Sequence, residues 1–193
     1  MHLFPEQYWV VCAKLFSFSK VKLLFTEHNT NNRRLKNRFF KIFDKYIYRF
    51  YDKIICISYG VLNIIKCHTS LPRSSFEIIE NGINLNSFQQ AKPISKKELG
   101  FQKSDVSDVF IIQVAGFRPQ KDQQTLIKSL IFLPANVKLL LVGEGVLKQA
   151  CETFVGELGL QERVSFLGIR TDVPQLLKTA DILVLSSHYE GLS

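Results

Sequence analysis

The second half of the chain alternates between short apolar runs and amphipathic segments, and this alternation restricts the fold more than any other feature. The predicted strands are residues 110–115, 137–142, 164–167 and 182–185, and the predicted helices are residues 125–133, 146–158 and 173–179. Strands that alternate with helices predict right-handed βαβ units on a parallel sheet. Because the strands are almost continuously apolar, both faces of that sheet are expected to be covered.

The first half shows a similar but less regular alternation. Its predicted strands are residues 22–26, 54–57 and 76–79, and its predicted helices are residues 33–51 and 61–66. The polar run from Asn81 to Lys97 predicts a turn followed by a linker. We therefore place a domain boundary there and divide the chain into residues 1–90 and 91–193.

The distribution of charge follows the same division. The 193 residues carry 25 Lys and Arg against 17 Asp and Glu, which gives a formal net charge of +8. Residues 1–90 hold 13 basic and six acidic side chains, whereas residues 91–193 hold 12 and 11. With 46% hydrophobic and 22% charged residues, neither half has the composition of a disordered or fibrous chain.

Composition and motifs argue against several classes of protein. A membrane-spanning helix needs about 20 mostly apolar residues, and Lys14, Lys20 and Lys22 interrupt the apolar start of the chain, which also lacks the basic leader of a signal peptide. The four cysteines have neither metal-ligand spacing nor the density of a disulfide scaffold, so a reducing, cytoplasmic setting is expected. No Asp-x-Asp metal motif occurs, and no metal or cofactor is predicted.

The composition also suggests a nucleic-acid-binding protein. The isoelectric point near 9.4 and the interleaving of aromatic and basic residues are typical of such proteins. However, the sequence contains no recognised DNA- or RNA-binding motif, and the second half is close to neutral. No nucleic-acid partner is therefore predicted.

The loop after the strand at 110–115 contains two cations, Arg118 and Lys121. Ligands of open α/β sheets bind beyond the carboxyl ends of the strands. Between a strand end and a helix start, backbone N–H groups and the helix dipole favour an anion. The two side chains could hold a diphosphate, with the arginine offering bidentate hydrogen bonds. The alternative is a solvated basic turn.

The loops after the other three strands also carry candidate binding residues. In Gly143-Glu144-Gly145 the glycines allow a tight turn and a close approach to a ligand. Gly168 and Arg170 follow the third strand, where the backbone could hold a base or a sugar, and Asp172 is a natural helix cap. After the last strand, the carboxylate in Glu190-Gly191-Leu192 could accept hydrogen bonds from sugar hydroxyls, or it could simply be an exposed loop glutamate.

Taken in order, these segments resemble the retaining, nucleotide-sugar-dependent glycosyltransferases of family 4, which have the GT-B fold. The resemblance runs from about His2 to Ser193. The matching segments are Glu27-His28-Asn29, Ile57-Ser58, Ile79 to Asn84, Arg118 to Lys121, Gly143 to Gly145, and Asp181 to Ser186 leading into Glu190-Gly191. The resemblance implies an α/β, GT-B-like fold with parts of two Rossmann-like parallel-sheet domains: the end of an acceptor-side domain in residues 1–90 and the start of a donor domain in residues 91–193.

The resemblance also implies roles for individual residues. Arg118 and Lys121 would bind the diphosphate of a UDP- or GDP-sugar, and Glu190 would contact the transferred sugar. His28 would be the acceptor-side histidine, unless it only caps a strand end. The implied substrate-binding residues are Gly116, Gly143, Glu144, Gly145, Gly168, Arg170, Gly191 and Leu192. The implied reaction is transfer of a hexose-type sugar, with retention, to a glycan or lipid-linked acceptor in cell-surface polysaccharide or glycoconjugate biosynthesis.

The chain departs from the family pattern in two ways. In many members the phosphate-binding arginine stands where this chain has Gly116, two places before Arg118. The family's second glutamate would fall beyond Ser193, and the Gly-rich loop of the first domain would precede Met1. The chain is therefore expected to be truncated at both ends. An inactive remnant and a GT-B-fold nucleotide-sugar epimerase are the alternatives.

Residues 33–53 alternate basic and aromatic side chains. On a helix, Phe39, Phe43, Tyr46 and Phe50 fall on one face. In one interpretation this face packs into the core and the basic face is solvated. In the other, the segment docks on an anionic membrane, which would suit a lipid-linked acceptor and a peripheral location on the inner face of the cell membrane.

Overall fold

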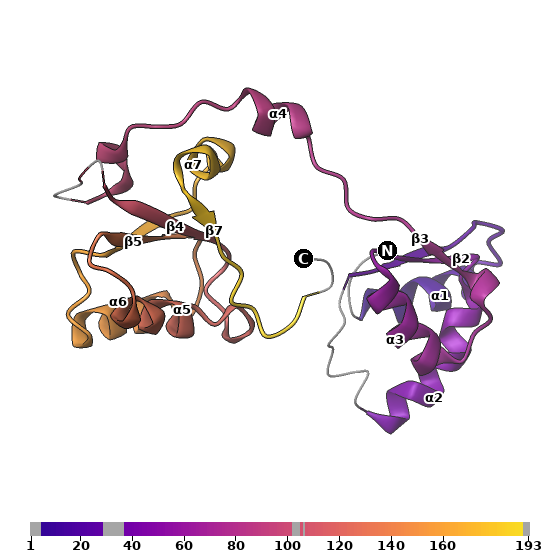
Figure 1. Cartoon of the computed structure of the whole chain (residues 1–193). Helices are drawn as coiled ribbons and strands as arrows, with labels where there is room; N and C mark the ends of the chain where they lie inside the picture. Colours follow the sequence, from indigo (N-terminus) through magenta and orange to yellow (C-terminus); the bar gives the residue numbers. More distant parts are fainter. Residues whose placement is uncertain (1–4, 29–36, 102–104, 106, 191–193) are drawn as a thin grey trace. The chain divides into compact units, whose positions relative to one another are not determined.

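The computed structural model describes residues 5–28, 37–101, 105 and 107–190. Within these residues the chain forms two compact units (Figure 1). The first unit consists of the described residues between Met1 and Gly82, together with Tyr189 and Glu190. The second unit is Ile83–His188. The domain boundary near residue 90 stays a prediction.

The first unit is built on a parallel sheet with the strand order β1-β2-β3 among the described residues. The strands are β1 (Leu24–Glu27), β2 (Lys53–Cys56) and β3 (Phe76–Ile78). Along β1 and β2 buried and exposed residues alternate, so one face carries Phe25, Ile54 and Cys56 into the core. Each strand lies within two residues of its predicted position, and the predicted parallel arrangement is confirmed.

Helices cover one face of this sheet (Figure 1). They are α1 (Glu6–Phe16), α2 (Arg38–Ile47, continued by a 3-10 turn at Tyr48–Phe50) and α3 (Tyr59–Thr69). Side chains of the preceding residues cap two of them, because Asn37 accepts a hydrogen bond from the N–H of Phe39 and Ser58 accepts one from that of Val61. The sequence pattern missed α1, and residues 33–36 of the predicted long helix lie outside the described residues.

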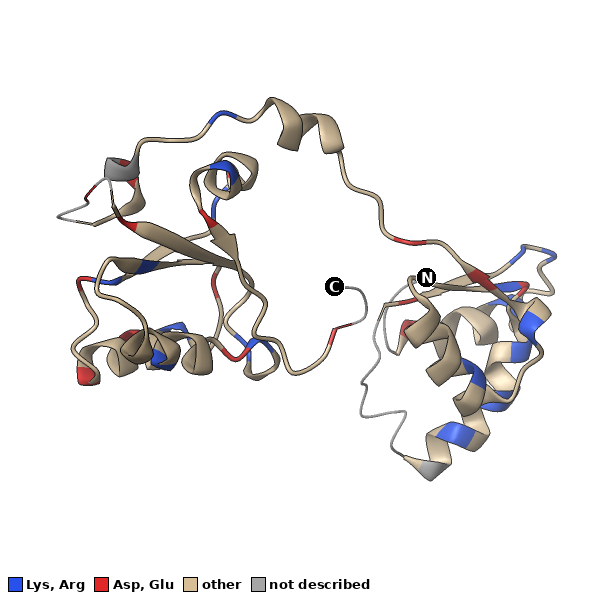
Figure 2. Ribbon diagram, viewed as in Figure 1, with Lys and Arg blue, Asp and Glu red and all other residues tan. Residues whose placement is uncertain are grey.

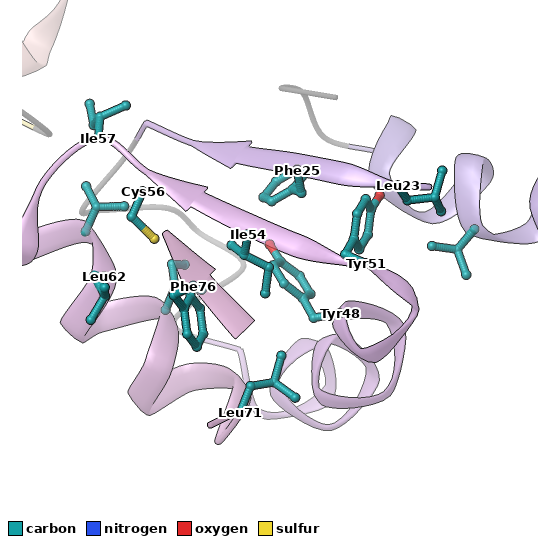
Figure 3. Packing of buried hydrophobic residues seen from close by; sticks show 13 residues of the cluster. Leu23, Phe25, Tyr48, Tyr51, Ile54, Cys56, Ile57, Leu62, Leu71 and Phe76 are labelled. Carbon is teal, nitrogen blue, oxygen red and sulfur yellow. The ribbon is translucent and has the colours of Figure 1, made fainter. Parts of the chain in front are cut away.

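Aromatic rings fill the space between sheet and helices (Figure 3). The ring of Phe25 meets Tyr48 edge-on with centroids 5.3 Å apart, and Tyr51 lies 5.6 Å from Phe25 on another side. Such edge and tilted geometries are the preferred ones for aromatic pairs. The hydroxyl of Tyr51 also donates to the carbonyl of Gln7 (2.7 Å), which joins the core to α1.

The aromatic face of α2 does not belong to this core. Phe39 is 85% exposed, Phe43 50% and Tyr46 58%. The interpretation in which this face packs inward is therefore wrong. The helix turns its other side, with Asp44 and Tyr48, towards α1, α3 and the sheet, because Asp44 has buried polar partners there.

The second unit is a parallel α/β layer structure with the strand order β6-β5-β4-β7 among the described residues. The strands are β4 (Val109–Val114), β5 (Val137–Val142), β6 (Val164–Gly168) and β7 (Ile182–Leu183). All of β5 is buried. Helices α5 (Gln123–Ser129) and α6 (Lys148–Glu157) lie on one face and α7 (Val173–Thr179) on the other (Figure 1). Each face has its own apolar core, which confirms the predicted two-sided coverage.

The run predicted as a linker contains a further helix, α4 (Leu85–Gln90). It lies against α7, and Leu85, Phe88, Pro174 and Leu177 line the hollow between the two helices. The contact with α7 supports this short helix, which the polar composition of the segment did not indicate. Across the described part of the chain, no helix has both the length and the apolar character needed to cross a bilayer.

Candidate functional site

The loops at the carboxyl ends of β4, β5 and β6 hold one another through backbone hydrogen bonds. The N–H of Phe117 donates to the carbonyl of Glu144 (3.0 Å), and the N–H of Gly143 donates to the carbonyl of Gly168 (2.8 Å). Three loops that the sequence singled out separately therefore meet at one edge of the sheet, where ligands of open α/β folds bind.

The glycines of the β5 loop allow this close approach. Gly143 has φ +138°, and a Cβ added there would lie 2.2 Å from the carbonyl oxygen of Ala115. At Gly145 a Cβ would lie 2.5 Å from the carbonyl oxygen of Phe117. Both spaces are too small for any side chain. In this structure, these two glycines serve the packing of one loop against its neighbour.

Arg118 and Lys121 belong to a loop that is anchored at both ends. Phe117 is fully buried and its ring packs against Phe166, with centroids 5.9 Å apart. Arg118 follows in an extended conformation and is exposed, and a 3-10 turn at Pro119–Lys121 leads into α5. The buried ring of Phe117 fixes the start of the loop. The backbone position of the next residue, Arg118, is therefore defined, although its side chain is exposed.

Two polar side chains hold the other end of this loop. Gln113, on β4, is buried, and its Nε2 donates to the carbonyl of Lys121 (3.1 Å) and to the hydroxyl of Ser186 (2.9 Å). The Ser186 hydroxyl lies 2.8 Å from the same carbonyl. Sequence reasoning assigned no role to Gln113. The only indication in the sequence is that Gln113 is a polar residue within an otherwise apolar strand.

Further contacts complete the frame of the loop. The side-chain amide of Gln123 donates to the carbonyl of Gly116 (3.1 Å), and the N–H of His188 donates to the carbonyl of Gln120 (2.9 Å). The side chain of Asp122 accepts a hydrogen bond from the N–H of Thr125 (3.3 Å) and so caps the start of α5. The segment after β7 therefore runs beside the loop that carries Arg118 and Lys121.

Two other predicted binding residues, Glu144 and Arg170, have their charges paired with side chains close by in the sequence. The Lys148 ammonium donates to the Glu144 carboxylate (2.6 Å), and this hydrogen bond raises the pKa of Lys148. Arg170 donates two hydrogen bonds to Asp172 (2.7 and 2.6 Å). Asp172 stands at the start of α7, but its side chain makes no capping hydrogen bond there. The predicted cap is therefore wrong, because the guanidinium of Arg170 binds the carboxylate instead.

The Arg170–Asp172 pair predicts a pH-dependent change in stability. Its hydrogen bonds hold the pKa of Asp172 below the ordinary 3.8. A depressed carboxyl pKa stabilises the fold above the pKa of the unfolded chain, and that stability is lost as the pH falls through the folded pKa. In Arg170→Gln we expect the pKa of Asp172 to rise, and stability to fall by less than about 1 kcal/mol at pH 7, with no difference below both pKa values. NMR titration and urea unfolding test this. An unchanged pKa of Asp172 in the variant would contradict it.

A small pocket opens on the α5–α6 side of the Arg118 loop, with a volume of about 220 Å³. Small-molecule sites usually measure about 300–1,000 Å³. The lining includes Arg118 but not Lys121: Arg118, Pro119, Asp122, Gln123, Gln124, Leu147 and Cys151. We do not assign a ligand to this pocket, because it contains only one of the two predicted phosphate-binding cations.

The remaining predicted residues belong to the first unit or lie outside the described chain. His28 directly follows β1 and is half-buried. Glu190 is half-buried and groups with the first unit. Gly191 and Leu192 lie outside the described residues, and their binding roles stay predictions.

Two family models cover most of the chain. The model described as glycosyl transferases group 1 matches residues 95–193, and the model described as glycosyltransferase family 4 matches residues 1–87. An uncharacterized glycosyltransferase of Methanocaldococcus jannaschii is 31% identical over 153 residues, which are 77% of this chain and 37% of the relative.

Two further comparisons extend over almost the whole chain. The N-acetylgalactosamine-N,N'-diacetylbacillosaminyl-diphospho-undecaprenol 4-alpha-N-acetylgalactosaminyltransferase of Campylobacter jejuni is 28% identical over 191 residues, which are 96% of this chain and 50% of the relative. The crystal structure of Anabaena HepE in complex with UDP superimposes with a TM-score of 0.75 at 20% identity, covering 95% of this chain and 51% of HepE.

The parallel sheets, whose loops at the strand ends are joined by hydrogen bonds, and the structural similarity to HepE show a GT-B glycosyltransferase fold. The chain belongs to the family described as glycosyl transferases group 1, and its first 87 residues match the model of glycosyltransferase family 4. It spans half or less of the length of the curated relatives described above.

Proposed function

We propose that the protein containing this chain transfers a hexose-type sugar from a nucleotide-diphosphate sugar to a glycan or lipid-linked acceptor, with retention at the anomeric carbon. The observation that carries the proposal is the loop after β4, residues 116–121, whose backbone is held by side-chain hydrogen bonds. It presents the exposed Arg118 and the half-buried Lys121 at the carboxyl end of a parallel strand, and the side chains of Gln113 and Ser186 fix its backbone.

The chemistry of transfer gives the two cations their role. When the bond between the sugar and the diphosphate breaks, negative charge develops on the departing phosphate. Fixed cations aimed at developing charge are usually the largest single contribution to catalysis. Arg118 would hold phosphate oxygens through its planar fork, and Lys121 would act as a point charge. The departing phosphate itself could take the proton of the acceptor hydroxyl, so a hydrolase-type carboxylate pair is not needed.

Named relatives support the donor and acceptor classes. HepE has been crystallised with UDP and with UDP-glucose. The Campylobacter jejuni relative is named for an acceptor carried on diphospho-undecaprenol. We therefore propose a UDP-sugar, with a GDP-sugar as the second choice, and an acceptor carried on a polyprenyl diphosphate. A peripheral location on the inner face of the cell membrane, where cell-surface polysaccharides are assembled, would fit this acceptor.

A transfer assay tests the function. The protein that contains the chain is incubated with labelled UDP-sugars or GDP-sugars and an undecaprenyl-diphosphate-linked saccharide, and NMR determines the anomeric configuration of the product. We expect acceptor-dependent transfer with retention from one nucleotide class. A product with inverted configuration would contradict retention, and epimerised nucleotide sugar without acceptor turnover would favour the epimerase. UDP binding without any turnover would indicate a remnant.

A further inference from the structure

The segment after β7 is attached to the end of the loop after β4 through two of its residues. The hydroxyl of Ser186 lies 2.8 Å from the carbonyl oxygen of Lys121 and 3.0 Å from that of Asp122. The N–H of His188 donates to the carbonyl of Gln120 (2.9 Å). The three acceptors are consecutive in the sequence, so the segment follows the backbone on either side of Lys121.

One further contact joins two side chains across the same boundary. Nε2 of His188 lies 3.5 Å from Oδ2 of Asp122, so the two groups form an ion pair when the imidazole is protonated. The His188 side chain is 63% exposed and that of Asp122 only 20%. The other carboxylate oxygen of Asp122 caps α5 through Thr125. Figure 2 shows blue and red residues together in the loop between β4 and α5. The Asp122 carboxylate therefore connects the segment after β7 to the start of α5.

The backbone at Asp122 indicates why its side chain matters. Asp122 has φ 44° and ψ 51°, which is the left-handed region. Glycine adopts this conformation without steric cost, whereas side chains disfavour it and Asp and Asn tolerate it best. The two contacts of the carboxylate, with Thr125 and with His188, are what an aspartate provides at this position and a glycine does not.

We propose that His188 is a positioning residue for the sugar transfer, an inference that rests on the proposed function. Gln113 and Ser186 hold the Lys121 carbonyl, and His188 holds the residues on either side of it: Gln120 by its backbone and Asp122 by its imidazole. A small displacement of a charged group from the charge that it stabilises costs rate. His188 thus acts through its two partners on the place from which the Lys121 ammonium extends.

Kinetics of the protein that contains the chain, with varied nucleotide sugar, test this role. Asp122→Asn keeps a residue that tolerates the left-handed backbone and can cap α5, but it removes the charge that faces the imidazole. We expect Asp122→Asn and His188→Ala each to lower kcat about threefold, the effect of one partly exposed ion pair. The KM for the donor should change less than about twofold, because Lys121 acts on charge that develops as the bond breaks.

Two further variants test whether the effect belongs to the pair. The double variant Asp122→Asn, His188→Ala should lose about threefold as well, rather than the roughly ninefold loss of two independent effects, because both changes remove the same contact. His188→Lys puts a cation opposite Asp122 and should recover at least about half of the original kcat. A role in folding alone would lower the unfolding temperature without this pattern in kcat.

Glu157→Gln is the matched control, because it removes an exposed carboxylate at the end of α6. It should keep kcat within about a factor of two. A faster Asp122→Asn variant would overturn the proposal, since it would show that the carboxylate only repels the diphosphate. Additive losses in the double variant would also overturn it. If the unchanged protein transferred no sugar, the proposed function and this inference would fall together. An active protein whose variants keep their kcat would remove the positioning role alone.

Discussion

Replacing Lys121 by alanine is expected to lower kcat/KM for sugar transfer by roughly two to three orders of magnitude, the usual effect of removing one group that stabilises developing charge. The ammonium extends from a loop whose backbone is fixed at the Lys121 carbonyl by Gln113 and Ser186. Loss of the side chain removes the charge without removing those hydrogen bonds, so the fold should persist. Steady-state kinetics with varied nucleotide sugar measure the effect in the protein that contains the chain.

Lys128→Ala is the matched control for this experiment, because Lys128 is an exposed lysine on α5, just after the same loop. It should leave kcat/KM within about a factor of two, as a distant surface charge does. If Lys121→Ala turned over donor as fast as the unchanged protein, the phosphate-binding role would have to be withdrawn. The transfer function itself would stand, because the unchanged protein would still be active.

The second large effect is expected for Gly143→Ala, which should lower the free energy of unfolding by about 3 kcal/mol or more. The new Cβ would lie 2.2 Å from the carbonyl oxygen of Ala115 and 2.9 Å from its carbonyl carbon. Both atoms belong to backbone that pairs with β5, so neither can move without breaking the hydrogen bond between Ala115 and Val142. Urea unfolding of the chain measures the loss.

Gly156→Ala provides the control in the same unit. Gly156 lies within α6, and a Cβ there would meet only the side-chain amide of Gln161, at 3.8 Å. Alanine should therefore stabilise the helix by up to about 1 kcal/mol. Equal stability changes in the two variants would show that the contact between the β4 and β5 loops is not tight.

The order and type of the strands could be predicted because each one is a local apolar run. The predicted bounds of β5 and α7 match the structure, and the strands of the first unit differ by no more than two residues. Helix α4 could not be predicted in this way. It has only six residues, too few for a clear helical periodicity, and its contact is with α7, which is far away in the sequence.

The orientation of α2 shows a second limit of sequence patterns. Hydrophobic periodicity correctly places Phe39, Phe43 and Tyr46 on one face, but it does not say whether that face is inside. The deciding residue is Asp44, whose partners Tyr8 and His68 lie 36 and 24 positions away. Polar contacts between residues so far apart in the sequence cannot be recognised from the pattern of neighbouring residues.

The candidate site shows the same contrast between local and distant information. Arg118, Lys121 and the glycines of the β5 loop follow apolar strands directly, so their gathering at one sheet edge could be predicted. The bracing of the β4 loop could not, because Gln113 and Ser186 are 73 positions apart in the sequence.

The carbonyl of Lys121 accepts hydrogen bonds from both Gln113 and Ser186, and this has a consequence for the thermodynamics of the proposed donor binding. A loop that is already ordered loses little conformational entropy when an anion arrives, so more of the interaction enthalpy appears as affinity. In a chain whose Gln113 is replaced by leucine, the loop would have to be ordered by the ligand itself. Calorimetry would then show a more unfavourable entropy of UDP binding, while the two cations that we propose as phosphate ligands, Arg118 and Lys121, would be unchanged.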